Sequence, residues 1–208
     1  MLSRSFLSSL AVSLYLLSMP IYAASVPGVQ NFDKVDERVY RGAQPTDEGF
    51  RNLAKLGVKV ILDLRETDQR SAVEERVVTA AGMRYVNVPM TGLTPPTDVQ
   101  ITKILTLLED SASGPTFVHC KRGADRTGAV IAAYQIDFLK WETARALADA
   151  KAHGMGYFQL PRQAYIRAFK TRGINSDAAG KPSVAGPTPV IAAPIPEGAQ
   201  QTSKPYFN

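Results

Sequence analysis

The sequence predicts an α/β fold in which a mostly parallel central sheet is flanked by helices. Short apolar runs alternate along the chain with longer segments of helical spacing, which is the pattern of repeated strand–helix units. One of these runs, at residues 58–64, is apolar almost throughout, as expected of a strand buried on both faces. Gly57 and Gly82 follow two of the helical segments and mark their ends.

The first half of the folded region is predicted to contain three strands and two helices. Phe50 and Leu53 have helical spacing ahead of Gly57, and the next helical segment stops at Gly82. A further apolar run ends at Pro89, which does not continue a central strand. The expected elements are a short edge strand at 39–41, a helix at 47–56, a buried strand at 58–64, a helix at 69–81 and a strand at 84–88.

The second half is predicted to contain one strand and four helices. The first helix, at 98–110, carries aliphatic residues on one face, and either Thr97 or Asp98 caps its start. A loop that joins a strand to a helix lies at the carboxyl end of that strand, where open α/β sheets bind ligands. The remaining elements are a central strand at 116–119, a helix at 126–140 and two further helices at 141–153 and 161–172.

The first 23 residues have the pattern of a secretory signal peptide. Arg4 supplies the positive start, residues 10–17 are apolar, and small residues precede a cleavage point after Ala23. We therefore expect an exported protein, periplasmic or secreted, that has no stable membrane span after cleavage. An uncleaved N-terminal anchor is the alternative.

The rest of the chain divides into a folded region and a tail. Residues 26–173 are long enough for one domain with a sizeable core. Residues 174–208 are rich in proline and alanine and lack apolar periodicity, so we expect a flexible tail there. Nothing in the sequence indicates an oligomer, and the protein is expected to act as a monomer.

Charge and composition narrow the classes of ligand. The formal net charge of +5 suits an anionic ligand. No basic run is interleaved with aromatic residues, so nucleic acid is not an expected partner. His119 and His153 are the only histidines, and neither stands at metal-ligand spacing from carboxylates or thiols. We expect neither a metal nor another cofactor.

The most informative segment runs from His119 to Gly128 and holds the only cysteine of the chain. It follows an apolar strand and precedes a helix, so backbone N–H groups and the helix dipole point at one spot. Such a spot binds a dianion like phosphate, and it lowers the pKa of a nearby thiol because the thiolate is stabilised. Cys120 is therefore the candidate nucleophile, and Arg126 offers a planar fork that matches two phosphate oxygens.

The other residues of this segment have supporting roles. Thr127 can donate a hydrogen bond to the Cys120 sulfur when that sulfur leaves phosphorus, and Gly123 stands where the chain curls around the anion. His119 is expected beneath the loop, where its hydrogen bonds order it. The candidate phosphate-binding residues are Lys121, Arg122, Gly123, Ala124, Asp125 and Arg126.

The pattern H-C-x5-R-[ST]-G at 119–128 resembles the cysteine-dependent protein tyrosine and dual-specificity phosphatase superfamily. The segments 39–45 and 60–65 resemble its atypical small branch from bacteria, fungi and plants. The resemblance implies a phosphatase-like fold with the phosphate loop between a strand and a helix. It also implies hydrolysis of phosphate monoesters through a cysteinyl-phosphate. The implied substrates are phosphotyrosine or phosphoserine/threonine proteins, or inositol phosphates.

Two other functions fit parts of the same segment. A rhodanese-like sulfurtransferase also cradles a reactive cysteine in a loop, although its loop is usually shorter than the five residues between Cys120 and Arg126. A non-catalytic module that binds phosphorylated ligands is the second alternative. The presence of Cys120, Arg126 and Thr127 together disfavours it.

The general acid is not evident from the sequence. Breaking a bond to a poor leaving group needs a proton donor, which in this superfamily is usually an upstream aspartate. The usual place falls near residues 88–90, which contain no acid. Asp98, after a loop at 91–97 that could fold over the pocket, is the candidate acid, with helix capping as its alternative role. Asp125 is the second candidate, although capping the helix or orienting the loop or Arg126 is the favoured role for it.

Overall fold

The structure, a computed structural model, describes residues 25–172. The predicted signal segment 1–23 and the predicted tail 174–208 lie outside the described residues. The described residues belong to one compact unit that ends at Arg172. None of the helices within this part of the chain is long and apolar enough to cross a membrane.

Five strands form one sheet, and the predicted mostly parallel arrangement is confirmed. The strand order is β1-β2-β5-β3-β4, with only the β1–β2 pair antiparallel. The strands are β1 (Asp33–Lys34), β2 (Val39–Ala43), β3 (Val60–Asp63), β4 (Arg84–Asn87) and β5 (Thr116–Cys120). The strand β5 lies at the centre of the sheet, so the segment that follows it emerges between the ends of β2 and β3.

The prediction that residues 39–41 form an edge strand is wrong. The strand β2 lies between β1 and β5, because Asp33 and Lys34 pair with Arg41 and Tyr40. A strand of two residues shows no alternation of polar and apolar side chains, so the sequence offers no signal for it.

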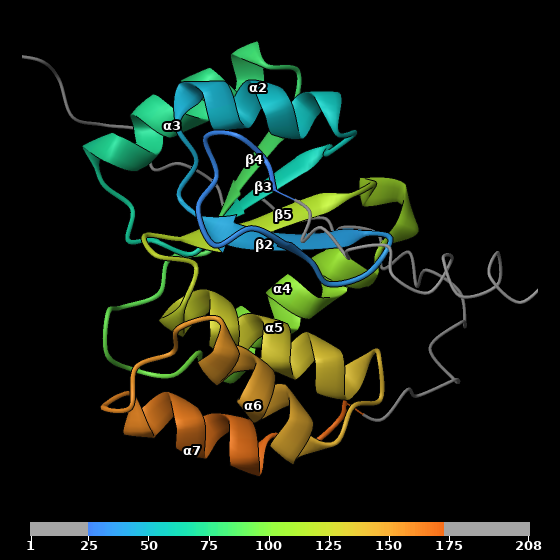
Figure 1. The fold of residues 1–208 in the computed structure, drawn as a ribbon, viewed down its shortest axis with the longest axis vertical. Coiled ribbons are helices and arrows are strands. Elements are labelled where there is room, and N and C mark those ends of the chain that lie inside the picture. Colours follow the sequence, from blue (N-terminus) through green and yellow to red (C-terminus); the bar gives the residue numbers. More distant parts are fainter. Residues whose placement is uncertain (1–24, 173–208) are drawn as a thin grey trace, which may run out of the picture. The chain divides into compact units, whose positions relative to one another are not determined.

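Helices cover both faces of the sheet (Figure 1). The helices α2 and α3 lie on one face, while α4, α5, α6 and α7 lie on the other. Their bounds are α2 (Asp47–Lys55), α3 (Gln69–Ala80), α4 (Asp98–Glu109), α5 (Asp125–Asp137), α6 (Thr143–Ala152) and α7 (Leu160–Ala168), with a short 3₁₀ turn at Ser111–Ser113. Each predicted helix is present, and the last three end earlier than the apolar spacing indicated.

The core consists of apolar clusters on both sides of the sheet and between the outer helices. One cluster joins β2, β3 and β5 to α4 and α5, and a second lies between the sheet and the helices α2 and α3. A third joins α5 to α6 and α7. Burial of each large aliphatic side chain contributes about 1.5–3 kcal/mol. Residues 127–137 of α5 are all buried, so this helix is held on every side and its N-terminus is fixed.

Candidate active site

The segment predicted to bind phosphate lies at the carboxyl ends of the parallel strands. The strand β5 ends at Cys120, and α5 begins at Asp125. The turn between them therefore presents the free N–H groups of a buried helix N-terminus beside the thiol. In Figure 1 this turn, the segment between β4 and α4, and the segment between α6 and α7 all lie on the same side of the molecule.

Gly123 allows the turn to pack directly on the backbone of β2. Its φ is +67°, and a Cβ at this position would lie 2.3 Å from the carbonyl carbon of Gly42 and 2.6 Å from the amide nitrogen of Ala43. No other residue type fits there without moving the strand. Arg41 adds a hydrogen bond, because its Nη2 donates to the Gly123 carbonyl at 3.1 Å. The end of β2 thus fixes the curl of the phosphate loop.

Cys120 is 3% exposed and lies in surroundings that favour its thiolate. Burial raises the pKa of this thiol, but the Thr127 hydroxyl and amide, the charge of Arg126 and the Arg122 amide outweigh burial, so the pKa is lowered. The buried Thr127 hydroxyl has no other hydrogen-bond partner within residues 25–172. It is therefore available to the sulfur.

One edge of the Arg126 guanidinium is hydrogen-bonded to the protein, and the other edge is available to a ligand. Its Nη1 donates to the Met90 carbonyl at 3.2 Å. No carboxylate within residues 25–172 forms an ion pair with this guanidinium. A half-buried arginine that lacks a carboxylate next to a thiolate is suited to bind an incoming dianion.

The basic and the small residues of the loop differ in their exposure. Lys121 and Arg122 are exposed, whereas Gly123 and Ala124 are buried. Arg122 pairs with Asp125 at 2.5 Å. The candidate phosphate ligands of this segment are thus its amides and Arg126, with Lys121 and Arg122 at the rim.

Asp125 uses both carboxylate oxygens in the protein. One oxygen pairs with Arg122, and the other accepts a hydrogen bond from the Gly156 amide at 2.9 Å. Asp125 is the first residue of α5, and the N-cap position belongs to Ala124, which has no side chain to cap the helix. The carboxylate therefore ties the loop to the segment between α6 and α7, which agrees with the orienting role.

Asp98 makes none of the hydrogen bonds or ion pairs that hold the phosphate loop in the described structure. Thr97, not Asp98, caps α4, because its hydroxyl accepts from the Gln100 amide and the Gln100 side chain accepts from the Thr97 amide. Asp98 is exposed and lines a hollow of about 440 Å³ with residues of α7, among them Tyr165. Within residues 25–172 no hydrogen bond or ion pair joins it to Cys120 or Arg126. Its assignment as the acid stays a prediction.

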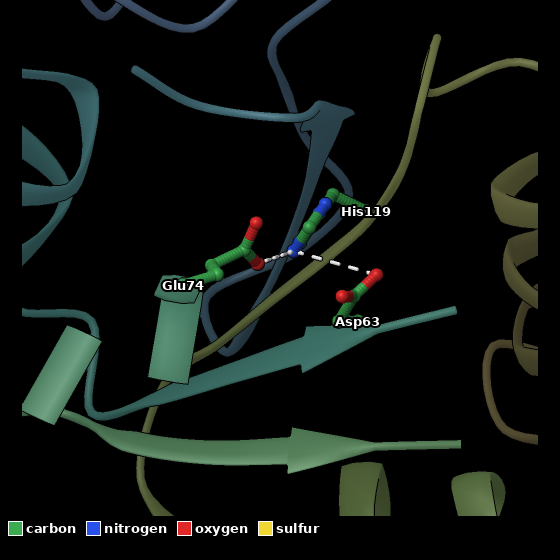
Figure 2. A group of neighbouring side chains, drawn as sticks. All are labelled: Asp63, Glu74 and His119. Atoms are coloured by element: carbon green, nitrogen blue, oxygen red, sulfur yellow. Dashed lines mark ion pairs between the residues drawn. The ribbon is translucent and has the colours of Figure 1, made fainter. Parts of the chain in front are cut away.

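A network of charged groups lies beneath the loop (Figure 2). His119 is fully buried, and its Nε2 is 2.8 Å from Glu74 Oε1 and 4.0 Å from Asp63 Oδ1. The short contact is an ion-pair distance, since neither atom makes a hydrogen bond of good geometry. Burial lowers the pKa of His119, while Glu74 and Asp63 raise it, and the net shift is upward. His119 is thus the strand residue directly before Cys120, and its side chain is enclosed with two carboxylates.

The same network gathers three possible metal ligands that the spacing in the sequence did not reveal. The ligand atoms of Asp63, Glu74 and His119 lie within 4.8 Å of one another. Arg65 already supplies the cation, because its Nη2 is 2.7 Å from Asp63 Oδ2 and 2.5 Å from Glu74 Oε2. Arg65 therefore pairs with both carboxylates, and the arrangement is better suited to an ion-pair network than to a metal.

Glu74 and Arg162 are two buried charged residues near the site that the sequence analysis did not single out. Arg162 is in the first turn of α7, and its guanidinium binds the segment between β4 and α4. For Glu74 a signal existed, because it shares the buried face of α3 with Ser71 and Val78. A charged residue on a buried helical face indicates a partner elsewhere in the fold. Arg162 follows a proline at a helix start and has no comparable signal.

Comparisons with known proteins agree with this geometry. A family model described as "DSP-PTPase phosphatase fused to NAD+ Kinase" matches residues 18–168. The rice protein named "Probable NAD kinase 2, chloroplastic" is 31% identical over 121 residues, which are 56% of this chain and 12% of that protein. The dual specificity protein phosphatase TpbA of Pseudomonas aeruginosa is 28% identical over 158 residues, which are 74% of this chain and 70% of that one.

Solved structures show the same fold. The core catalytic domain of the PP-IP phosphatase SIW14 from S. cerevisiae superposes with a TM-score of 0.63 at 26% identity, covering 74% of this chain and 94% of that one. The crystal structure of P. aeruginosa TpbA gives a TM-score of 0.57 at 25% identity, covering 69% and 92%. The chain therefore belongs to the DSP-PTPase phosphatase family, within the cysteine-dependent protein tyrosine phosphatase superfamily.

Proposed function

We propose that this chain is a cysteine-dependent phosphatase that hydrolyses phosphate monoesters. The observation that carries the proposal is the meeting of three features at one turn. These are a thiol with a lowered pKa at Cys120, an arginine, Arg126, that has no carboxylate partner among the described residues, and the N-terminus of the buried helix α5. Together they provide a nucleophile and preorganised donors for the transferring phosphoryl group.

The reaction has two displacements at phosphorus. In the first, the Cys120 thiolate attacks, a phosphorus–sulfur bond forms, and the bond to the leaving oxygen breaks while that oxygen takes up a proton. In the second, water attacks, the phosphorus–sulfur bond breaks, and the water proton returns to the group that served as acid. The loop amides and Arg126 stabilise the equatorial oxygens in both steps. Thr127 donates to the departing sulfur.

The acid of the first step is proposed to be Asp98, and Asp125 is the alternative. Asp125 already has two partners, in Arg122 and Gly156, and must lose one of them to donate a proton. Asp98 is exposed and has no such commitment within the described structure, but the loop at 91–97 must bring it over the pocket. A comparison of Asp98→Ala and Asp125→Ala on substrates with good and poor leaving groups decides between them. The true acid matters most for the poor leaving group.

The substrate is proposed to be a phosphorylated protein or an inositol phosphate. TpbA is named a dual specificity protein phosphatase, and the SIW14 structure is described as a PP-IP phosphatase. Phosphate release from phosphotyrosine and phosphoserine peptides, from inositol phosphates and from a small aryl phosphate would rank these classes. The monomeric state is likewise proposed, and light scattering of the purified protein tests it.

The location is proposed to be periplasmic or secreted, on the strength of the pattern at residues 1–23. N-terminal sequencing of the protein recovered from cell fractions tests this point. A protein that begins after Ala23 supports export, and one that begins at residue 1 in the cytoplasmic fraction contradicts it.

The mechanism predicts that Cys120→Ser abolishes turnover while binding of inorganic phosphate is retained, because the loop amides and Arg126 remain. Activity should be unchanged by EDTA, since no step uses a metal. Release of phosphate and calorimetric titration with inorganic phosphate measure the two effects. Activity lost on chelation would contradict the mechanism. Thiosulfate–cyanide activity with a persulfide on Cys120 would instead support the rhodanese-like alternative, which the family assignment disfavours.

A further inference from the structure

Arg162, in the first turn of α7, carries a buried charge that no carboxylate of the described part of the chain neutralises. The residue has 0% exposure. Its Nη1 donates to the Gly92 carbonyl at 2.8 Å and its Nη2 to the Thr91 carbonyl at 2.7 Å, and Nη1 also contacts the Gln159 side chain. Within residues 25–172 it forms no ion pair. Burying a guanidinium is costly, so a chain that does so with carbonyl partners alone holds those carbonyls firmly.

The carbonyls that Arg162 holds adjoin the carbonyl that holds Arg126. Met90 accepts from Arg126 Nη1 at 3.2 Å, and Thr91 and Gly92 follow it directly in the chain. Three consecutive carbonyls of the segment between β4 and α4 are thus bound by two guanidinium groups. One guanidinium comes from the start of α5 and the other from the start of α7.

The charges of groups in and beside the phosphate loop act on Arg162. Burial lowers the pKa of Arg162, the charges of Asp125 and Cys120 act in the opposite direction, and the charge of Arg126 acts in the same direction as burial. All three groups belong to the phosphate loop or the helix start that follows it. Arg162 is nevertheless fully enclosed, so it reaches a ligand only through other residues.

We propose that Arg162 is a positioning residue for the phosphatase site, acting through Met90–Gly92 on Arg126. Its hydrogen bonds to the Thr91 and Gly92 carbonyls fix the segment Met90–Gly92 in place. The Met90 carbonyl then accepts a hydrogen bond from one edge of the Arg126 guanidinium. The opposite edge then faces the phosphate before any ligand arrives. This proposal rests on the proposed function, because the orientation of Arg126 matters only if Arg126 binds the phosphoryl group.

The positioning role depends on the two donor nitrogens of the Arg162 guanidinium, and a positive charge alone is not sufficient for it. A lysine keeps the positive charge but has a single nitrogen, so it cannot hold two adjacent carbonyls in the same fixed geometry. A purely structural arginine would contribute to stability alone. The chain contains such an arginine as a matched control. Arg38 also donates to two adjacent carbonyls, Glu109 at 3.2 Å and Leu108 at 3.3 Å, at the far end of α4.

The first experiment compares Arg162→Lys, Arg162→Met and the control Arg38→Met on a small aryl phosphate. We expect kcat/KM to fall about 10- to 100-fold in both Arg162 variants, because misplaced catalytic groups cost rate on that scale. Arg38→Met should lower the melting temperature and leave kcat/KM unchanged. If the Arg162 variants lose only melting temperature, or if Arg162→Lys retains the wild-type kcat/KM, the proposal is overturned. If Arg162→Met does not fold, the kcat/KM of Arg162→Lys alone tests the proposal.

The second experiment measures binding of inorganic phosphate by calorimetry in a double-mutant cycle. If Arg162 acts through Arg126, Arg162→Lys weakens binding about 10-fold in the wild-type background and has no further effect beside Arg126→Lys. Additive losses would overturn the proposal. This measurement also separates two failures. A wild-type chain that binds phosphate but hydrolyses none of the substrates contradicts the proposed function. In that case the double-mutant cycle still tests whether Arg162 acts on phosphate binding through Arg126.

Discussion

Cys120 owes its reactivity to neighbours that counteract its own burial. A thiol that is 3% exposed would ordinarily have a raised pKa, yet the net shift is downward. The first group to oppose burial is the Thr127 hydroxyl, followed by the Thr127 amide and the charge of Arg126. The thiolate is thus stabilised by hydrogen bonds from the same helix start that is proposed to bind the phosphate.

Thr127→Ala should therefore raise the pKa of Cys120. With a higher pKa, less thiolate is present at any pH below it, so alkylation by iodoacetamide slows and its pH profile moves to higher pH. Thr127→Ser keeps the hydroxyl and should leave the profile close to that of the wild type. An unchanged midpoint in Thr127→Ala would show that the hydroxyl does not stabilise the thiolate.

Gly123→Ala should be far more destabilising than an ordinary glycine substitution. The left-handed backbone costs an alanine about 1–2 kcal/mol, and the overlap with Gly42 adds about 1–3 kcal/mol. Gly82 is the matched control, because its φ is +78° and no atom lies within 4 Å of its added Cβ. Urea denaturation of both variants separates the two costs, and Gly123→Ala should also lose binding of inorganic phosphate. Equal losses of stability in both variants would mean that β2 yields to the new Cβ.

The residues of the loop itself could be identified from the sequence, whereas their supports could not. Cys120, Arg126 and Thr127 stand at fixed spacing in one contiguous turn, so the sequence alone indicates their chemistry. Arg162 and Glu74 reach the site from other elements, and only the packing of those elements brings them there. The roles of Asp98 and Asp125 stayed open for the same reason.

At the scale of elements, α3 supports the phosphate loop through the sheet. Glu74 projects from α3 to His119 on β5, and His119 also faces Asp63 at the end of β3. Gln44, just after β2, donates to Glu74 at 3.2 Å, and its amide donates to the Lys121 carbonyl at 3.4 Å. Glu74 thus contacts His119, directly before the loop, and Gln44, whose amide is bonded to the loop residue Lys121.

Glu74→Gln should lower stability more at pH 6 than at pH 9. The folded-state pKa of His119 is raised above its unfolded value of about 6.5. The stabilisation from its charged pair is therefore fully present below that unfolded value and is lost as pH rises through the folded pKa. At pH 6 the loss should approach the roughly 3–5 kcal/mol of a broken buried pair.

Urea denaturation at the two pH values measures this difference. The comparison is best made with Cys120→Ser as the parent, so that ionisation of the thiol does not contribute. The adjacent exposed Glu75 provides the control, and Glu75→Gln should have little effect at either pH. A loss in Glu74→Gln that is independent of pH would mean that only its pair with Arg65 contributes.

The elements could be predicted where their apolar periodicity is long. The buried strand β3 and the helices α2, α3 and α4 agree with the sequence because their spacing extends over whole turns or a whole run. The helix α7 ends sooner than expected, because the chain adopts extended backbone at Phe169, and α6 ends one residue before its predicted end. Their ends depend on contacts with α5, which periodicity does not report.

At the scale of the whole molecule, residues 25–172 should fold and act without the remainder of the chain. The three apolar clusters and the phosphate loop all lie within this range. A protein restricted to these residues should show one cooperative unfolding transition and the kcat/KM of the full chain on an aryl phosphate. Calorimetry and initial rates check the two statements. A drop in either would show that the outer segments contribute to the domain or its site.

The site depends on segments far apart in the chain. Arg41 near the start, the carbonyls of Met90–Gly92, the loop after β5 and Arg162 near the end of the described residues all contribute to it. The central position of β5 and the all-round burial of α5 bring these segments together. Sequence alone predicts the layers of this fold, and the layers then determine which distant residues meet.

The solitary thiol has a consequence for oxidative chemistry. Cys120 is the only cysteine of the chain, and it is free. Peroxide acts on thiolates, so the group that attacks phosphorus is also the group most readily converted to a sulfenic acid. No second cysteine in the chain can trap that species as an internal disulfide. Recovery from oxidation therefore depends on a thiol supplied by another molecule, before further oxidation makes the damage permanent.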